Sequence, residues 1–315
     1  MSSSYKIGFG CASLTRLNDR LALELLSHAY DEGITHYDVA RLYGEGNAER
    51  ILGEFARNKR DSITITTKFG LNSPGVIPKK NKMMGIIKSI VKTIPGLQKP
   101  AAKKLHPAFI RDFSLKNANA SLEKSLRELN TDYIDYYLLH EAGSVDANNE
   151  SLLTFLDQKK REGKILEYGI GSWYHQIEGD CNLFNSKYRV FQFDSNVFNE
   201  NILKLRNREN KLVITHSALQ GVKILEQNLA GLDGDLIRSH SRALNINLNN
   251  YKMIPGMLLF YSFLLNPDTI TLFSSTRKDN ISNNLRYLRL FSSLHPDRKA
   301  LKQFIRDLKN GSGQL

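Results

Sequence analysis

The sequence predicts an α/β fold, a single (β/α)8 TIM barrel over residues 1–315. Short apolar runs alternate with helical patterns along the chain, as expected for parallel strands joined by right-handed crossovers. Eight such units fit a chain of 315 residues. The alternative, a doubly wound sheet, usually has a G-x-G-x-x-G turn after its first strand. Here that strand ends in "GFGCASL", which has different spacing and no third glycine, so the barrel is preferred.

The predicted strands are short runs rich in apolar and β-branched residues, and each is followed by a helix or helical stretch. They cover residues 5–11, 34–39, 62–69, 133–140, 164–172, 190–197, 211–219 and 269–275.

The predicted helices have apolar residues at helical spacing and polar residues at their ends. Asp19 is placed to cap the amphipathic stretch 19–33, and Ser114 opens a helix that closes near Asn130. Residues 251–266 are mostly apolar and suggest a buried helix, although Pro255 and Gly256 disturb its start. The other expected helices are one from residue 47, 150–163, 199–210 and 279–291.

Composition predicts a protein with a large core and no membrane span. Of the residues, 41% are hydrophobic, and there is no uninterrupted apolar run of transmembrane length. The start "MSSSYKIGFG" lacks the basic and apolar regions of a secretory signal. Cys11 and Cys181 form no metal or redox spacing. Reduced thiols and a cytoplasmic location are therefore expected, and nothing predicts an oligomeric state.

The positive charge belongs mainly to one segment. The formal net charge is +12, but residues 71–110 contain eight lysines and no acidic residue. A nucleic-acid-binding protein would show a basic surface with interleaved aromatics or a recognition motif, and neither is present. We therefore interpret 71–110 as a lysine-rich insertion in the barrel and expect no nucleic-acid partner.

The insertion contains one amphipathic stretch. Between Met83 and Ile94 the apolar residues share one helical face, and Lys82, Lys88 and Lys92 lie off it. The favoured interpretation is a lid helix packed on the barrel mouth. The less favoured one is contact of residues 82–94 with an anionic membrane surface or an acidic substrate.

Four reactive side chains follow three successive strands. Asp38, Lys68 and His140 stand at strand ends, and Tyr43 lies in the loop after the second strand. In a barrel these positions converge on one pocket. An ammonium group lowers the pKa of a nearby phenol, a carboxylate keeps the ammonium in place, and a histidine can orient a substrate oxygen. The set suits proton donation to a carbonyl oxygen that gains negative charge, and no ligand cluster suggests a metal.

These residues resemble the catalytic tetrad of the aldo-keto reductases. The matching motifs are Asp38-x4-Tyr43 with the following "GEGNAERILGE", Lys68 in "TKFG" and His140 in "LLH". The resemblance extends from the first strand to the last strand and its helix, and bacterial members have similar long loops after the third strand. It implies a barrel that uses NADPH, less often NADH, to reduce carbonyls. Tyr43 would be the general acid, supported by Lys68, Asp38 and His140.

The resemblance also implies cofactor contacts. The family usually has Gly-x-Ser-Asn after the fifth strand, but here "GIGSW" keeps only the serine, Ser172. Gln192 would lie under the nicotinamide amide, and His216 replaces the usual stacking tyrosine. The remaining implied contacts, to pyrophosphate, adenosine phosphate and adenine, are Ser217, Leu219, Ser275, Thr276, Arg277, Asn280 and Asn284. Arg277 and Lys278 favour a 2′-phosphate and hence NADPH.

Two functions follow from this resemblance. The first is an NADPH-dependent oxidoreductase that reduces an aldehyde or ketone to the alcohol, or catalyses the reverse reaction, with a small-molecule carbonyl as its substrate. The second is a nucleotide-binding redox sensor or accessory subunit with little turnover, resembling the potassium-channel β subunits that share the fold. The complete tetrad favours the enzyme, and the altered nicotinamide contacts keep the alternative open.

Overall fold

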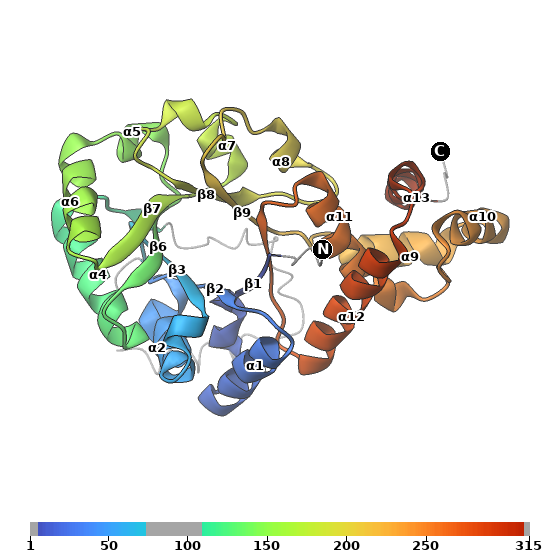
Figure 1. Cartoon of the computed structure of the whole chain (residues 1–315), viewed down its shortest axis with the longest axis horizontal. Coiled ribbons are helices and arrows are strands. Elements are labelled where there is room, and N and C mark those ends of the chain that lie inside the picture. Colours follow the sequence, from blue (N-terminus) through green and yellow to red (C-terminus); the bar gives the residue numbers. More distant parts are fainter. Residues whose placement is uncertain (1–5, 74–108, 312–315) are drawn as a thin grey trace, which may run out of the picture.

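The computed structural model describes residues 6–73 and 109–311. Its centre is a closed barrel of parallel strands in the order β1-β10-β9-β8-β7-β6-β3-β2, so the predicted (β/α)8 fold is confirmed (Figure 1). The barrel strands are β1 (Ile7–Gly10), β2 (His36–Asp38), β3 (Thr64–Phe69), β6 (Ile134–His140), β7 (Ile165–Gly171), β8 (Val190–Asp194), β9 (Leu212–His216) and β10 (Ile270–Phe273).

The barrel interior is filled below its C-terminal end by a compact apolar cluster. Registered neighbours in a sheet point to the same face. Leu138 is in register with Lys68, and Ile214 is in register with Gln192. The cluster therefore shares the barrel interior with the polar side chains near the strand ends and packs beside them. Its members are Leu138, Val190, Ile214, Ile270 and Leu272.

Helices surround the barrel and bury the outer faces of the strands against a larger apolar cluster. Ser114 caps its helix by accepting from the Asn117 amide, as expected. The predicted Asp19 cap is wrong, because the Asn18 side chain accepts from Leu21 N and Asp19 is the first helical residue. The helices with predicted counterparts are α1 (Asp19–Asp31), α2 (Asn47–Ala56), α4 (Leu115–Leu129), α6 (Glu150–Arg161), α8 (Asn201–Lys204), α11 (Ile254–Leu265) and α12 (Lys278–Leu294).

One predicted helix is much shorter than expected, and several helices were not predicted. The stretch 199–210 is helical only in α8, because Glu200, Asn207 and Asn210 have left-handed φ values of 45°, 55° and 59°. The group α9, α10 and α13 lies together at one side of the barrel (Figure 1). The helices without a prediction are α5 (Ser144–Ala147), α7 (Tyr174–Ile177), α9 (Val222–Gly231), α10 (Gly234–Leu244) and α13 (Arg298–Asn310).

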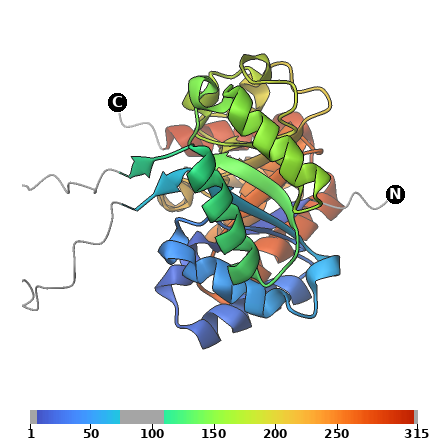
Figure 2. The ribbon, with the colours of Figure 1, turned by 90° about the vertical axis from the view of Figure 1, so that its left-hand side faces the viewer.

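The lysine-rich insertion leaves and re-enters the barrel through a small hairpin. Strand β4 (Leu71–Asn72) follows β3, and β5 (Ile110–Arg111) precedes α4; the two pair antiparallel, with Leu71 opposite Arg111. In Figure 2 the hairpin projects at the side of the molecule away from the N-terminus. The predicted amphipathic helix over 83–94 lies outside the described residues.

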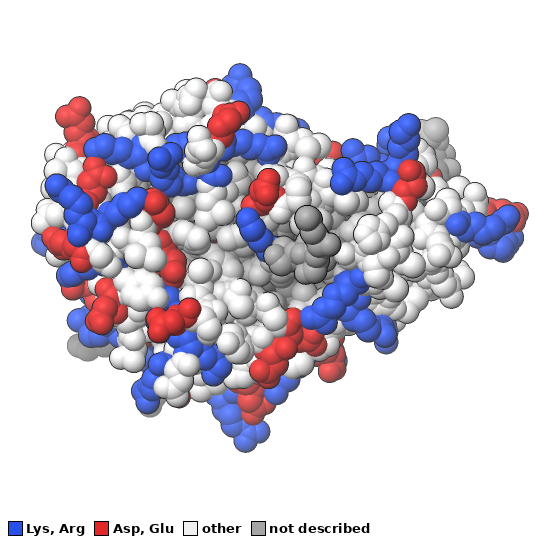
Figure 3. Space-filling view, in the orientation of Figure 1, with Lys and Arg blue, Asp and Glu red and all other residues white. Residues whose placement is uncertain are grey.

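The described surface has charges of both signs, and the two thiols lie in the core. On the face seen in Figure 3, lysines and arginines are interspersed with acidic residues. Both cysteines are buried and unpaired. Within residues 6–73 and 109–311, no helix combines the length and hydropathy needed to cross a membrane.

Candidate active site

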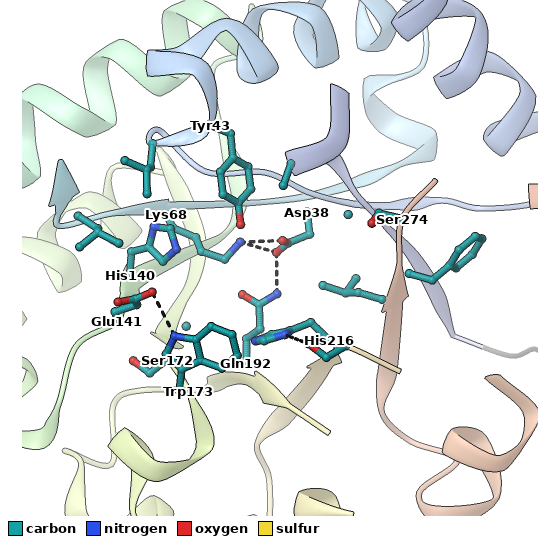
Figure 4. Close-up of a pocket in the computed structure, with 18 of the residues that line it drawn as sticks. Asp38, Tyr43, Lys68, His140, Glu141, Ser172, Trp173, Gln192, His216 and Ser274 are labelled. Carbon is teal, nitrogen blue, oxygen red and sulfur yellow. Dashed lines mark hydrogen bonds and ion pairs between the residues drawn. The ribbon is translucent and has the colours of Figure 1, made fainter. Parts of the chain in front are cut away.

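The four predicted catalytic residues meet at the C-terminal end of the barrel. Asp38 ends β2, Lys68 lies next to the end of β3, and His140 ends β6. Tyr43 begins a short 3-10 turn, Tyr43–Gly46, in the loop that follows β2. All four line one cavity of about 580 Å³ (Figure 4). Parallel strands bring them together because their carboxyl ends share one face.

Lys68 and Asp38 form a buried ion pair at the bottom of the cavity. Lys68 Nζ donates to Asp38 Oδ1 at 2.7 Å, to Oδ2 at 2.8 Å and to the Val39 carbonyl at 3.0 Å. Gln192 Nε2 also donates to Asp38 Oδ2, at 2.8 Å. Burial is the largest influence on the pKa of Lys68 and acts to lower it, but Asp38, Tyr43 and Cys11 together raise that pKa overall. The ammonium group therefore stays charged and fixed.

The Tyr43 hydroxyl points toward the Lys68 ammonium (Figure 4). Lys68 Nζ lies 5.5 Å from the centre of the Tyr43 ring. Lys68 lowers the pKa of Tyr43, as expected, but burial raises that pKa by more, so the net direction is upward. The phenol is consequently protonated at neutral pH and available as a proton donor.

His140 stands beside Tyr43 as a neutral imidazole. The two rings meet edge to face with centroids 6.1 Å apart. Burial, followed by the nearby Lys68 and His216, lowers the pKa of His140 to about 3. Its buried Nδ1 meets no hydrogen-bond partner among the described residues. A neutral ring with one N–H suits a hydrogen bond to a substrate oxygen.

The first group of predicted cofactor residues lines the same cavity. This group is Ser172, Gln192, His216, Ser217 and Leu219. Ser172 Oγ donates to the Ala142 carbonyl at 2.7 Å and keeps its acceptor capacity. His216 Nδ1 lies 2.9 Å from Ser217 Oγ, which fixes the ring orientation. Gln192 braces Asp38 in addition to lining the cavity.

The second group of predicted cofactor residues lies at the junction of β10 and α12, outside this cavity. Ser275 Oγ accepts from Arg277 N at 3.0 Å and donates to the Arg277 carbonyl at 3.1 Å. Thr276, Arg277 and Asn280 are exposed near the helix start, a location suited to an anion. Asn284 is only 4% exposed and packs against the start of α11.

Glu141 and Trp173 are among the cavity residues that were not predicted. Glu141 directly follows His140, so extending the strand-end argument by one residue would have found it. Trp173 follows Ser172, where the resembling family has asparagine, and its aromatic character masked its position at the mouth. Trp173 Nε1 donates to Glu141 Oε1 at 3.2 Å, and the indole meets the His216 ring at 5.4 Å (Figure 4).

Comparisons with known proteins identify the family and the fold. The sequence model of the Aldo/keto reductase family matches residues 6–297. The chain superposes on aldo-keto reductase AKR11C1 from Bacillus halodurans, in its holo form, with a TM-score of 0.66 at 20% identity, covering 96% of this chain and 91% of that one. A Klebsiella pneumoniae aldo-keto reductase in complex with NADPH gives 0.59 at 17% identity, covering 98% and 93%. Both structural similarities concern the fold.

The curated relatives match only about half of this chain. The Bacillus subtilis (strain 168) protein "Uncharacterized oxidoreductase YqkF" is 30% identical over 171 residues, which is 53% of this chain and 44% of that protein. The D-threo-aldose 1-dehydrogenase of Pseudomonas sp is 32% identical over 178 residues, which is 53% and 49%. The chain therefore aligns with less than half the length of these two relatives.

Proposed function

Because the chain belongs to the aldo/keto reductase family, we propose that it is an NADPH-dependent oxidoreductase that interconverts an aldehyde or ketone and its alcohol. The observation that carries the proposal is the convergence of Tyr43, Lys68, Asp38 and His140 in one cavity. When bound, the nicotinamide supplies or accepts the hydride. The protein's own residues then have to bind the carbonyl, orient it and move one proton.

Each tetrad residue has a role that follows from its state. Tyr43 is the proton donor, since burial keeps its phenol protonated and its hydroxyl faces the cavity. Lys68 places a positive charge beside the phenolate left after donation, and Asp38 holds Lys68. Neutral His140 donates to the carbonyl oxygen and fixes its direction. Together they stabilise negative charge at one oxygen.

The described residues fit a nicotinamide cofactor. The cavity wall opposite Tyr43 offers the flat His216 ring and the neutral polar groups of Ser172 and Gln192, which suit a planar amide-bearing heterocycle. The exposed start of α12, with Ser275, Thr276 and Arg277, suits phosphate groups. Arg277 adds a charge that favours the 2′-phosphate of NADPH.

A second candidate function is a nucleotide-binding redox sensor or accessory subunit. The observation in its favour is Trp173, which stands where the family usually has a carboxamide-binding asparagine and contacts the His216 ring. Such a change would weaken nicotinamide positioning without removing nucleotide binding. The complete tetrad favours the enzyme.

The test is oxidation of NADPH by the pure protein with a panel of aldehydes and ketones, followed by absorbance of the reduced cofactor. We expect turnover with at least one carbonyl. Tyr43→Phe should retain NADPH affinity but lose about a hundredfold or more in kcat, the scale of general acid catalysis. Tyr37→Phe serves as control, since Tyr37 bonds only backbone carbonyls outside the cavity. Near-normal turnover by Tyr43→Phe would remove that role, and NADPH binding without any turnover would favour the sensor.

A further inference from the structure

Glu141 contributes the net charge of the active-site cavity. Three charged side chains among the described residues line it, namely Asp38, Lys68 and Glu141. Lys68 Nζ is bonded to both oxygens of Asp38, at 2.7 and 2.8 Å, so these two charges offset each other. The two flanking histidines are His140 and His216. Burial is the main cause of the lowered pKa of each, and both are neutral at pH 7. The remaining charge is the half-buried Glu141 carboxylate.

The backbone holds Glu141 in a fixed place beside His140. Its φ of 57° is in the left-handed region, which is uncommon for a glutamate. Its N–H donates to the Gly171 carbonyl at 2.7 Å, and its carbonyl accepts from Arg111 Nη2 at 2.6 Å. The same carbonyl accepts from Gln176 Nε2 at 3.3 Å. Three neighbouring segments therefore set the direction of this side chain.

The Glu141 carboxylate retains free acceptor capacity. Trp173 Nε1 donates to Oε1 at 3.2 Å, and within the described part of the chain no ion pair includes Glu141. The nearby Arg111 guanidinium binds Asp146 Oδ2 at 2.6 Å, so it is already paired. An ionised carboxylate has about four lone-pair sites and accepts strong hydrogen bonds from hydroxyl or ammonium groups.

We propose that Glu141 is a specificity-determining residue that selects carbonyl substrates bearing a hydrogen-bond donor, such as a hydroxyl group, and rejects those bearing a carboxylate. The inference rests on the proposed function, since His140 would fix the carbonyl next to Glu141. A substrate hydroxyl gains a charge-assisted hydrogen bond there. A substrate carboxylate meets a like charge in a partly desolvated cavity, which disfavours its binding and its transition state alike.

The experiment uses three carbonyls that differ in one group: 3-(hydroxymethyl)benzaldehyde, 3-methylbenzaldehyde and 3-formylbenzoate. With NADPH, the unmodified protein should reduce the hydroxymethyl compound at least about tenfold more efficiently, in kcat/KM, than the carboxylate, the scale of one charged hydrogen bond. Glu141→Gln keeps size and an acceptor for Trp173 but removes the charge. It should raise kcat/KM for 3-formylbenzoate at least about tenfold, and change it for the methyl compound by less than about threefold.

The role of Glu141 is tested further by a matched control variant and by a binding measurement. Glu178 is also a glutamate with left-handed φ, 54°, but it is exposed and outside the cavity. Glu178→Gln should therefore leave kcat/KM for all three compounds unchanged. Trp173 is the single tryptophan of the chain and touches Glu141, so its fluorescence reports ligand binding without turnover. The affinities of the three compounds for the NADP⁺-saturated protein, which cannot reduce them, should follow the same order as kcat/KM.

The outcomes separate the two proposals. If no carbonyl is reduced, the proposed function fails, while the dissociation constants still decide the role of Glu141. If Glu141→Gln leaves both the kcat/KM ratios and the binding ratios of carboxylate to hydroxymethyl compound within about twofold of the unmodified protein, the inference is overturned. If Glu141→Gln unfolds, Glu141→Asn replaces it, because asparagine tolerates the left-handed backbone and also lacks the charge.

Discussion

Two buried histidines in the barrel interior, His36 and His140, have lowered pKa values. His36 is 4% exposed, and its Nδ1 lies 2.8 Å from Thr64 Oγ1. Burial lowers its pKa to about 4, while Asp38 opposes and Lys68 assists that shift. His140 behaves in the same way, with a pKa of about 3. Both rings are therefore neutral in the folded protein across the physiological range.

The lowered pKa values of these histidines predict that the folded protein loses stability in mild acid. The folded pKa of His36 is below the value of about 6.5 for an unfolded chain. Between pH 6.5 and 4 the unfolded chain thus binds more protons, so the free energy of unfolding falls as the pH falls. Each such histidine contributes up to about 1.4 kcal/mol per pH unit. His36→Asn should give a shallower pH dependence in chemical denaturation from pH 6.5 to 4.5, whereas parallel curves for the two proteins would contradict the assignment.

Coenzyme choice is expected to depend on Arg277. Its side chain is 71% exposed at the start of α12, with Asp279 Oδ2 at 3.6 Å as a loose partner. We predict tighter binding of NADPH than of NADH. Arg277→Ala should weaken NADPH binding by about 1–3 kcal/mol, the range for a charge-assisted hydrogen bond, and leave NADH nearly unchanged. Calorimetric titration measures both, with Arg286→Ala as a control on the same helix. Equal affinity of the unmodified protein for the two coenzymes would refute the assignment.

The site residues differ in how far the sequence could predict them. Asp38, Lys68 and His140 were predictable because the C-terminal ends of the strands in a barrel all face one pocket, so titratable residues there meet in it. The bond from Gln192 to Asp38 was not, since it joins β8 to β2 across the interior. The place of Glu141 in the cavity follows from its position directly after His140, but its left-handed backbone has no signal in the local sequence.

At the element scale, the Tyr43 turn is held by a buried network on α2. Glu49 is fully buried and accepts from Thr67 Oγ1 at 2.7 Å, Ser125 Oγ at 2.6 Å and Arg41 Nη1 at 2.5 Å. Arg41 also donates to the Glu45 carbonyl at 2.5 Å, so it spans the turn that carries Tyr43. The network connects α2, β3, α4 and the loop after β2.

Breaking this network should cost both stability and activity. Glu49→Ala leaves the Arg41 guanidinium, only 16% exposed, without its anion, and the expected loss is about 3–5 kcal/mol in the free energy of unfolding. Glu54→Ala, on the same helix but 49% exposed, should cost less than about 1 kcal/mol. Denaturant titration compares them, and kcat should fall for Glu49→Ala because Tyr43 loses its support. Similar destabilisation by both variants would exclude a special role for Glu49.

Helices were predicted well where one apolar face and a cap coincide. The stretch opened by Ser114 shows both, and α4 follows it closely. The sequence does not indicate a helix over residues 222–244, because the two helices there meet at Leu232 and Asp233, where a break interrupts the apolar periodicity. The overextended helix at 199–210 shows the converse, since good helix formers there are interrupted by asparagines in left-handed conformation.

At the scale of the whole molecule, the β4–β5 hairpin separates the insertion from the barrel. Asn72 pairs with Ile110, so the two ends of the insertion lie side by side. Replacing residues 78–100 by a short linker should therefore leave cooperative unfolding and NADPH binding intact, because closing a short loop between adjacent ends costs little entropy. Leu71 and Phe109, near the two ends of the insertion, line the cavity. Shortening the segment between them should therefore change the substrate range. Loss of cooperative unfolding in the shortened protein would contradict this separation.

The same variant tests the less favoured membrane interpretation of residues 82–94. Under that interpretation the full chain would co-sediment with anionic vesicles, and binding would fade as salt is raised because screening shortens the reach of the lysines. The shortened protein would lose this binding. Absence of vesicle binding by the full chain would exclude the membrane interpretation and leave the lid and the acidic-substrate interpretations.

The pairing of Ile7 with Thr271 also determines when the protein can finish folding during its synthesis. The first strand emerges from the ribosome long before β10, its second neighbour. Until β10 arrives, the partial sheet has two open edges, β1 and β9, which are templates for mispairing with other chains. Contacts this distant along the chain also form slowly. The nascent chain is therefore most in need of chaperone protection between the appearance of β9 and that of β10.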